Sequence, residues 1–420
     1  MRFLDESGLQ YFKSRLDKTY ADAKHTHSSR FCEKVLLYYG YPIALNKLWD
    51  VDKCAKAYGK YDICIFGDGY NEPSHQTYND TLQIFNAIRD RYKDTRIVGY
   101  VPIGVKEASG TGLTEAEIKS KIDKWIAMGV HGIFLDEFGY DYKVTRERQN
   151  NMVDYCHNHN LFVFANSWST EYCFSNDNMT LDWLPGFLPN PNGLASHLGP
   201  EDYYVYEHMF YDAELDNSDN LVVKCAKPDR ITDIINYYTE PKINGKSYYE
   251  VYGTKLFTLN GIPSTFTDDQ KTQMMSVCVL AAAMFNLDAI AFGDEHWGSS
   301  GHYDDWDMPN TNLASKKFNK IDIETRKDSS GNSFPYKWST LLNGVYYELV
   351  CEFSSADDRT YYDNKQYVSC GGDRVSNAWI SVYNLGNSFK KLDNTMANYI
   401  EKIETALDSP GSIIYSEVEW

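Results

Sequence analysis

Short apolar segments alternate with amphipathic segments along most of the chain. The apolar segments are rich in β-branched and aromatic residues, which predicts strands. We expect eight strands, within residues 33–42, 61–71, 96–104, 131–137, 161–169, 202–211, 254–263 and 287–298. Between them, apolar residues recur at helical spacing, which predicts helices over 80–93, 113–129, 146–160, 228–240 and 267–286.

The helix expected over 113–129 has the clearest boundaries. Thr114 stands at the N-cap, and Glu117 follows three residues later at the capping-box position. Gly129 ends the helix, as glycine commonly does at the left-handed C-terminal position.

Eight strands that alternate with helices predict the α/β class and a parallel (β/α)8 barrel of the TIM type. A doubly wound open sheet is the alternative. The first expected strand is not followed by GxGxxG, so nothing in the sequence indicates a dinucleotide site.

The chain ends differ in character from this middle part. Residues 1–23 have the spacing of an amphipathic helix, and 1–30 are expected to form an attachment or oligomerisation segment before a barrel over 31–300. Residues 301–420 are expected to form a small α+β extension or domain, with strands near 344–353, 365–370 and 377–385 and a helix over 389–408.

Composition narrows the class of partner. The 34 Tyr and 9 Trp hint at carbohydrate, since these rings stack on sugar faces, although Tyr also serves as a core residue. The formal charge of −18 argues against nucleic acid, anionic membranes and polyanionic glycans.

The sequence also bears on localisation. The N-terminus lacks the apolar stretch of a signal peptide, and no apolar run of about 18 residues predicts a membrane span. The nine cysteines are scattered without a CxxC pair, which indicates free thiols in a protein made in a reducing cytoplasm.

The first candidate catalytic residues lie in HGIFLDEFGYDY, residues 131–142, where an expected buried strand ends in Asp136 and Glu137. The carboxyl ends of barrel strands form one face, so Glu207 is expected at the same rim. Glycoside hydrolysis needs two carboxyl groups in different environments, and these three acids are the predicted catalytic residues. Adjacent strand residues point in opposite directions, so Asp136 and Glu137 cannot both face the barrel axis.

Other polar and aromatic residues near strand ends are expected to bind substrate. They are Asp68, Asn166, Trp168, Tyr38, Tyr70, Tyr140, Asp294, Glu295 and Trp297. Strand ends are polar in any case, so a purely structural role is the alternative. Minor alternatives are a metal site of Asp68 with Asp294, Glu295 and His296, and metal ligation by His157 and His159. We expect no cofactor for catalysis.

One part of the chain resembles spherulin-4-type glycoside hydrolases and endo-α-1,4-polygalactosaminidases. The similar segments are VGYVPIG, LTEAEIKSKIDKW, GVHGIFLDE, VFANSW and YVYE. The resemblance covers residues 33–210 and, loosely, 211–298. It implies a barrel that cleaves galactosamine-type polymers internally, with Asp136, Glu137, Asn166 and Glu207 at the matching positions. The chain departs from the family pattern at His131, where that pattern has Asp.

The N-terminal residues FLDESGLQYF followed by His25-Thr26-His27 resemble the opening segments of phage tail fibre and tail-associated proteins. In a homotrimer, the resemblance implies that His25 and His27 of three chains hold one structural metal ion. Two solvated linker histidines are the alternative.

These observations predict an endo-acting glycoside hydrolase of a bacterial surface or amino-sugar polysaccharide. It would be phage tail-associated, with tail or baseplate proteins as partners, and found in the virion or, before assembly, in the host cytoplasm. The alternative is a non-catalytic, carbohydrate-binding receptor-recognition protein of a phage tail.

Overall fold

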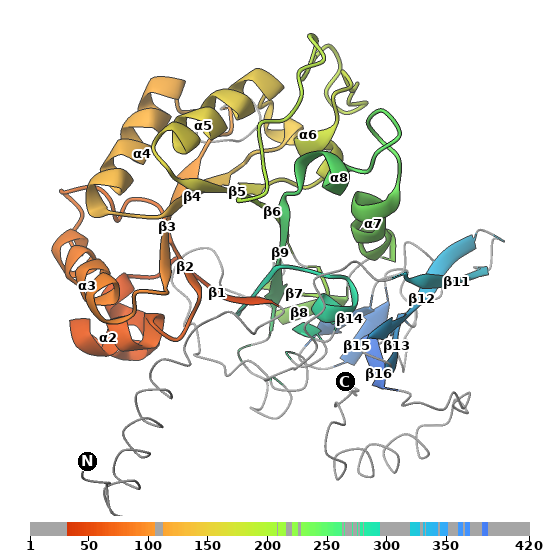
Figure 1. Ribbon diagram of the computed structural model, residues 1–420. Coiled ribbons are helices and arrows are strands. Elements are labelled where there is room, and N and C mark those ends of the chain that lie inside the picture. Colours follow the sequence, from red (N-terminus) through yellow and green to blue (C-terminus); the bar gives the residue numbers. More distant parts are fainter. Residues whose placement is uncertain are drawn as a thin grey trace, which may run out of the picture.

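Eight parallel strands close into a barrel in the computed structural model (Figure 1). The structure describes residues 32–105, 112–207, 209–215, 221–225, 228–262, 264, 271, 275, 278–279 and 281–294, and, towards the C-terminus, 320–327, 331, 333–342, 345–351, 360–363, 366–369 and 380–384. The barrel strands are β1 (Glu33–Tyr38), β2 (Ile63–Phe66), β3 (Arg96–Pro102), β4 (Gly132–Asp136), β5 (Phe162–Asn166), β6 (Tyr203–Tyr206), β9 (Lys255–Gly261) and β10 (Ala289–Gly293).

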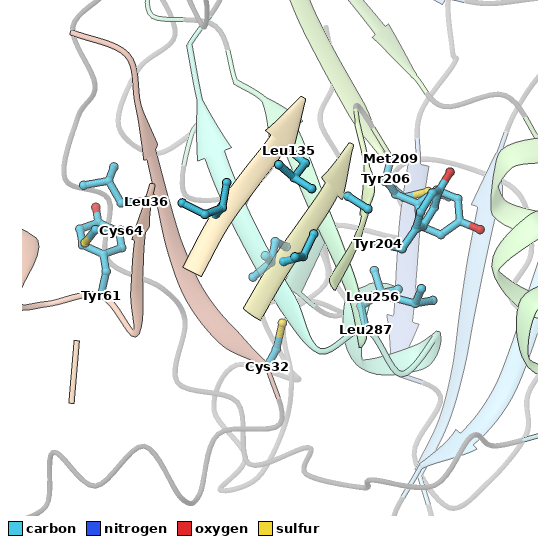
Figure 2. Close-up of a cluster of buried hydrophobic side chains, with 14 of the residues drawn as sticks. Cys32, Leu36, Tyr61, Cys64, Leu135, Tyr204, Tyr206, Met209, Leu256 and Leu287 are labelled. Atoms are coloured by element: carbon cyan, nitrogen blue, oxygen red, sulfur yellow. The ribbon is translucent and has the colours of Figure 1, made fainter. Parts of the chain in front are cut away.

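Helices surround this barrel (Figure 1). They are η2 (Pro42–Lys47), α2 (Val51–Tyr58), α3 (Tyr78–Arg91), α4 (Glu115–Met128), η4 (Tyr140–Tyr142), α5 (Arg146–Asn158), α6 (Thr170–Phe174), α7 (Pro228–Thr239) and α8 (Tyr248–Tyr252). Their apolar faces pack on outward side chains of the strands, among them Leu36, Tyr204 and Leu256 (Figure 2).

The predicted (β/α)8 architecture is therefore confirmed. The Thr114–Glu117 capping box of α4 is also confirmed, and Gly129 adopts a left-handed φ of 77° after the helix. The sequence reading missed α2, which Asp50 caps by accepting a hydrogen bond from the Lys53 N–H. It also missed a hairpin, β7 (Tyr211–Leu215) and β8 (Leu221–Cys225), that is inserted between barrel strands.

The barrel interior has three chemically distinct levels. The middle is apolar and includes Val35, Val98, Phe134, Phe164 and Val205. Below it, Tyr203 donates a hydrogen bond to Glu33, and Arg96 forms an ion pair with the same carboxylate at 2.5 Å. These residues close the N-terminal end of the barrel, which in this fold serves stability. The polar residues of the upper level form the site described below.

The lower end of the barrel repeats one capping contact between neighbouring strands. The residue just before β2, β4, β6 or β10 accepts a hydrogen bond from the second residue of the preceding barrel strand. The four pairs are Asp62 with Lys34, His131 with Ile97, Asp202 with Val163, and Asp288 with Leu256. His131 thus accepts through Nδ1 at 3.0 Å where the other three positions use aspartate, which gives its departure from the family pattern a structural role.

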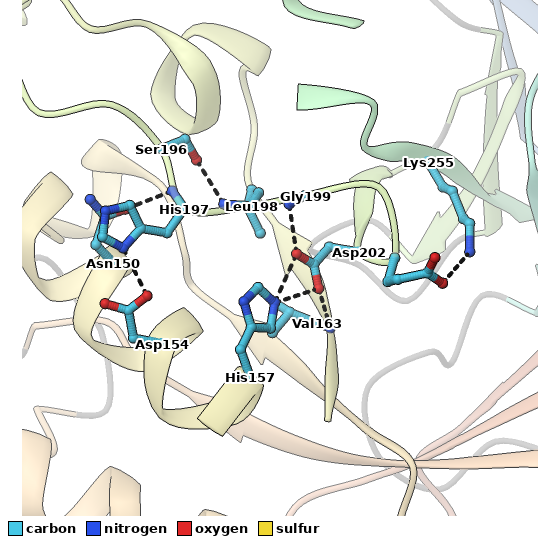
Figure 3. Close-up of polar contacts among 11 residues, drawn as sticks. Asn150, Asp154, His157, Val163, Ser196, His197, Leu198, Gly199, Asp202 and Lys255 are labelled. Carbon is cyan, nitrogen blue, oxygen red and sulfur yellow. Dashed lines mark hydrogen bonds and ion pairs between the residues drawn. The ribbon is translucent and has the colours of Figure 1, made fainter. Parts of the chain in front are cut away.

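Asp202 serves more than one donor. Its carboxylate is fully buried and accepts from the backbone N–H groups of Val163 and Gly199, each at 2.8 Å, and contacts His157 Nε2 at 3.0 Å (Figure 3). The contact with Asp202 raises the pKa of His157, although partial burial opposes this shift.

This contact predicts a pH dependence of stability. Because the folded-state pKa of His157 is raised, its contribution is fully present below the unfolded value of about 6.5 and is lost as pH rises through the folded value. We expect the urea midpoint of the wild type to fall across that window relative to His157→Gln. Parallel midpoints for the two proteins would contradict the prediction.

The C-terminal part contributes strands β11 (Asp322–Lys327), β12 (Ser333–Leu342), β13 (Val345–Cys351), β14 (Thr360–Asp363), β15 (Gln366–Ser369) and β16 (Ile380–Asn384). The last four fall in or beside segments predicted as strands, whereas β11 and β12 were not predicted. The boundary at residue 300 is not a clean division, because β14 pairs with β8 and because Trp338 and Leu349 belong to the main core cluster. The helices expected over 1–23 and 389–408 lie outside the described residues.

Two further sequence predictions concern the described part of the chain. Cys32, Cys54, Cys156 and Cys173 are buried free thiols, as expected. Among the described residues, no helix is long and apolar enough to cross a membrane.

Candidate active site

Asn166 joins two carboxylates at the C-terminal end of the barrel. Its Nδ2 donates to Asp136 Oδ1 at 2.8 Å and to Glu207 Oε1 at 2.7 Å. Because both bonds share one nitrogen, the two accepting oxygens are separated by at most the sum of those lengths, about 5.5 Å. The ends of three consecutive barrel strands, β4, β5 and β6, supply the three side chains, all at inward-facing positions.

Tyrosines surround this pair. The Tyr100 hydroxyl donates to Asp136 Oδ2, and the Tyr39 ring packs edge-on against Tyr100 with centroids 5.5 Å apart. Burial, followed by the negative charge of Asp136, raises the pKa of both tyrosines, and the same two causes raise the pKa of Tyr142. These phenols therefore stay protonated, and Tyr100 uses its proton to donate to Asp136.

Glu137 does not belong to the bridged pair. It adopts a left-handed φ of 55°, which is costly for a residue with a side chain and turns the chain just after Asp136. Its Oε2 accepts from the Gly104 N–H at 3.2 Å, and a Cβ at Gly104 would lie 2.3 Å from that oxygen. Glu137 thus ties the end of β4 to the loop after β3, and the catalytic role predicted for it stays a prediction.

Trp168 lies two residues beyond Asn166 and is 58% exposed. The Arg230 guanidinium covers one part of it, with Cζ 4.3 Å from the ring centroid. Arg230 also donates from Nη2 to the backbone oxygen of Glu207 at 3.0 Å. The indole predicted to bind substrate is thus held beside the Glu207 end of the site.

Three tyrosines predicted to bind substrate are instead core residues. Tyr38 has the outward orientation on β1 and lies in the cluster between barrel and helices, one residue before the inward Tyr39. Tyr70 is buried, and its hydroxyl donates to the Tyr39 backbone oxygen at 2.9 Å. Tyr140 is fully buried against Tyr172. None of the three has a ring face available for stacking.

The remaining predicted residues are also away from the bridged pair or outside the described part. Asp68 forms a surface ion pair with Lys121 at 2.8 Å. Asp294 is buried near Tyr38. Burial is the main cause of the raised pKa of Tyr38, and the charge of Asp294 is a smaller cause. Glu295, His296, Trp297, His25 and His27 lie outside the described residues.

The minor metal alternatives gain no support in the described part of the chain. His157 contacts Asp202, whereas His159 Nδ1 contacts the Tyr155 backbone oxygen, so the two imidazoles serve different partners. Within the ranges that the structure describes, no group of three or more His, Cys, Asp or Glu side chains could hold a metal ion.

The sequence reading missed Tyr39, Tyr100, Tyr142 and Arg230. Tyr39 and Tyr100 each continue the inward alternation of their strands, after Leu37 and Val98 respectively, but both faces of these strands are apolar in sequence, so the structure is needed to tell which face is inward. The inward positions at the upper ends of β2, β9 and β10 are Gly67, Gly261 and Gly293, so these strands add no side chain there.

Fold and site together define a (β/α)8 barrel with an acidic, tyrosine-rich site at its C-terminal end, in a fold whose members are often enzymes. No family model and no curated protein matches the chain. Solved structures give weak matches. Pyruvate carboxylase from Rhizobium etli has 12% identity and a TM-score of 0.36, over 62% of this chain and 23% of the carboxylase.

Two further structures match at a similar level. The carboxyl transferase domain of the Rhizobium etli enzyme with pyruvate has 11% identity and a TM-score of 0.36, over 66% of this chain and 42% of the other. Dihydropteroate synthase from Xanthomonas albilineans has 8% identity and a TM-score of 0.31, over 63% and 87%. This chain thus spans less than half the length of the carboxylase chains. At such scores the matches carry no argument about function, and the barrel assignment rests on the strand pairings.

Proposed function

We propose that the protein is a retaining, endo-acting glycoside hydrolase of an amino-sugar or bacterial surface polysaccharide. The observation that carries the proposal is the Asn166 bridge, which holds Asp136 and Glu207 with their nearest oxygens no more than about 5.5 Å apart. Carboxyl groups about 5–5.5 Å apart suit a covalent, retaining mechanism, whereas inversion needs about 6.5–9.5 Å to admit a water molecule.

The hydrogen bonds suggest different roles for the two acids. In a retaining mechanism one acid attacks the sugar, and the other donates a proton to the leaving oxygen and later takes one from water. Asp136 accepts from Tyr100 on one oxygen and from Asn166 on the other, and these two donors fix the orientation of its carboxylate for attack on the sugar. We therefore assign Asp136 as the nucleophile and Glu207 as the general acid and base.

The reaction follows from these roles. A carboxylate oxygen of Asp136 attacks the anomeric carbon while Glu207 gives its proton to the glycosidic oxygen, which leaves as an alcohol. Glu207, now ionised, then takes a proton from water, and the hydroxide displaces Asp136 from the anomeric carbon. Asn166 can hold both carboxylates throughout, because its amide has two N–H groups.

The direct test is release of reducing ends from a panel of amino-sugar and bacterial surface polysaccharides. The proposal requires that the wild type turns over at least one of them. Binding without turnover, at a site that includes the exposed Trp168, would support the non-catalytic glycan-binding alternative instead. Assembly into a phage tail rests on the resemblance of residues 1–30 and stays a prediction.

A further inference from the structure

Tyr39 stands across the barrel from the bridged carboxylates. It directly follows β1, and the closed strand order places β5 fourth from β1 in either direction around the barrel. Asn166 ends β5, and the neighbouring strands β4 and β6 lead to Asp136 and Glu207. The Tyr39 side chain packs on the inner cluster of the barrel, so it points inward like Leu37 before it. Tyr39 and the bridged pair thus belong to opposite walls of the upper barrel.

Neighbouring residues hold the Tyr39 side chain in place. Its ring packs edge-on against Tyr100, with centroids 5.5 Å apart, and the Tyr70 hydroxyl donates to its backbone oxygen at 2.9 Å. Gly67 leaves room for the ring, because a Cβ at that position would lie only 3.1 Å from Cδ1 of Tyr39. The side chain is therefore positioned before a ligand binds, which reduces the conformational entropy lost on binding.

The Tyr39 hydroxyl is a donor that the described part of the chain leaves unused. The Tyr100 hydroxyl donates to Asp136, whereas the Tyr39 hydroxyl makes no hydrogen bond with any described residue. Tyr39 is partly exposed, and its hydroxyl is not one of the buried unpaired polar atoms of the described chain, so it is open to a ligand. After burial, the charges of Asp136 and Glu207 raise the pKa of Tyr39, so its hydroxyl keeps its proton beside the pair.

The reaction defines which sugar atom such a donor meets. Asp136 attacks the anomeric carbon, whose neighbours in the sugar are the ring oxygen and C2. The ring oxygen gains positive charge in the oxocarbenium-like transition state and accepts poorly, whereas hydrogen bonds at position 2 strengthen there. We propose that the Tyr39 hydroxyl donates a hydrogen bond to the position-2 substituent of the sugar that Asp136 attacks, which makes Tyr39 a further catalytic residue. The proposal deepens the function proposed above and rests on it.

The test measures binding by calorimetry in the Glu207→Gln background, so that hydrolysis does not consume the ligand. The probes are an α-1,4-linked N-acetylgalactosamine tetramer and the same tetramer with hydrogen in place of each acetamido group. Adding Tyr39→Phe, which removes only the hydroxyl, should weaken binding of the acetylated tetramer by about 5–10-fold and leave that of the deoxy tetramer unchanged. With Glu207 in place, Tyr39→Phe should lower kcat/KM for the acetylated tetramer by about 10–100-fold.

Tyr38→Phe is the matched control, because Tyr38 precedes Tyr39 and lies in the cluster between barrel and helices. It should leave binding of both tetramers unchanged. Equal weakening of both tetramers by Tyr39→Phe, no weakening of either, or no binding of the acetylated tetramer would overturn the contact. Binding that depends on Tyr39 and on the acetamido group, with no turnover of any glycan by the wild type, would overturn the hydrolase proposal and leave the contact standing. Turnover that Tyr39→Phe does not change would do the reverse.

Discussion

Glu207→Gln is expected to lower the turnover of a cleaved polysaccharide by about 10³-fold or more, because an amide can neither protonate the leaving oxygen nor activate water. The substitution keeps the size of the side chain, and its amide oxygen can still accept the Asn166 hydrogen bond that now measures 2.7 Å. The loss should therefore appear in kcat, with ligand affinity largely retained. The measurement is the initial rate of reducing-end release at saturating substrate.

Glu137→Gln is the matched control for this loss. Its amide oxygen can still accept from the Gly104 N–H, which is the contact that Glu137 makes at 3.2 Å. We expect it to change kcat by no more than a few-fold. A large loss in Glu137→Gln with little loss in Glu207→Gln would reassign the chemistry to the residue that the structure places outside the bridged pair.

Asp202→Ala is expected to cost about 3–5 kcal/mol in the free energy of unfolding, since it leaves buried donors without their charged acceptor. Asp202 is fully buried and serves two backbone N–H groups as well as His157. The measurement is urea denaturation at a pH below the folded-state pKa of His157.

Asp154 provides the control for this prediction, because its contact with His197 Nδ1 at 2.8 Å is close to half exposed on both sides. Exposed pairs of this kind contribute little, so Asp154→Ala should leave the unfolding midpoint nearly unchanged. Equal effects of the two substitutions would show that the capping contact at β6 is not a main source of stability.

The sequence predicted the barrel because its signals are local. Each strand is a short apolar run, each helix is amphipathic, and boundaries such as Thr114 and Gly129 need only neighbouring residues. The helix α2 and strands β7, β8, β11 and β12 escaped prediction because they are short or lie in polar, mixed segments.

The site was predicted in part. Asp136, Asn166 and Glu207 were chosen from the ends of three strands, and those strands bring them together. Tyr38 was chosen instead of Tyr39 because strands of a parallel barrel are buried on both faces, so polar–apolar alternation does not reveal which residues point inward. An error of one residue along β1 therefore selects Tyr38, a core side chain, in place of Tyr39, which lies beside the proposed catalytic pair.

Arg230 could not be predicted from its neighbours in sequence. Its contacts with Trp168 and with the Glu207 backbone join residues that are distant along the chain, and they depend on where α7 packs. The contact of Glu137 with Gly104 could not be predicted for a related reason, because it depends on a left-handed φ of 55°, and backbone conformation of this kind is not visible in residue type.

The anomeric configuration of the first product, followed by proton NMR from the start of hydrolysis, distinguishes retention from inversion. Asn166 holds the nearest oxygens of Asp136 and Glu207 within about 5.5 Å of each other, so we expect the product to appear first with the configuration of the cleaved bond. Initial release of the opposite anomer would contradict a covalent intermediate on Asp136, and no release from any glycan of the panel would contradict the hydrolase assignment itself.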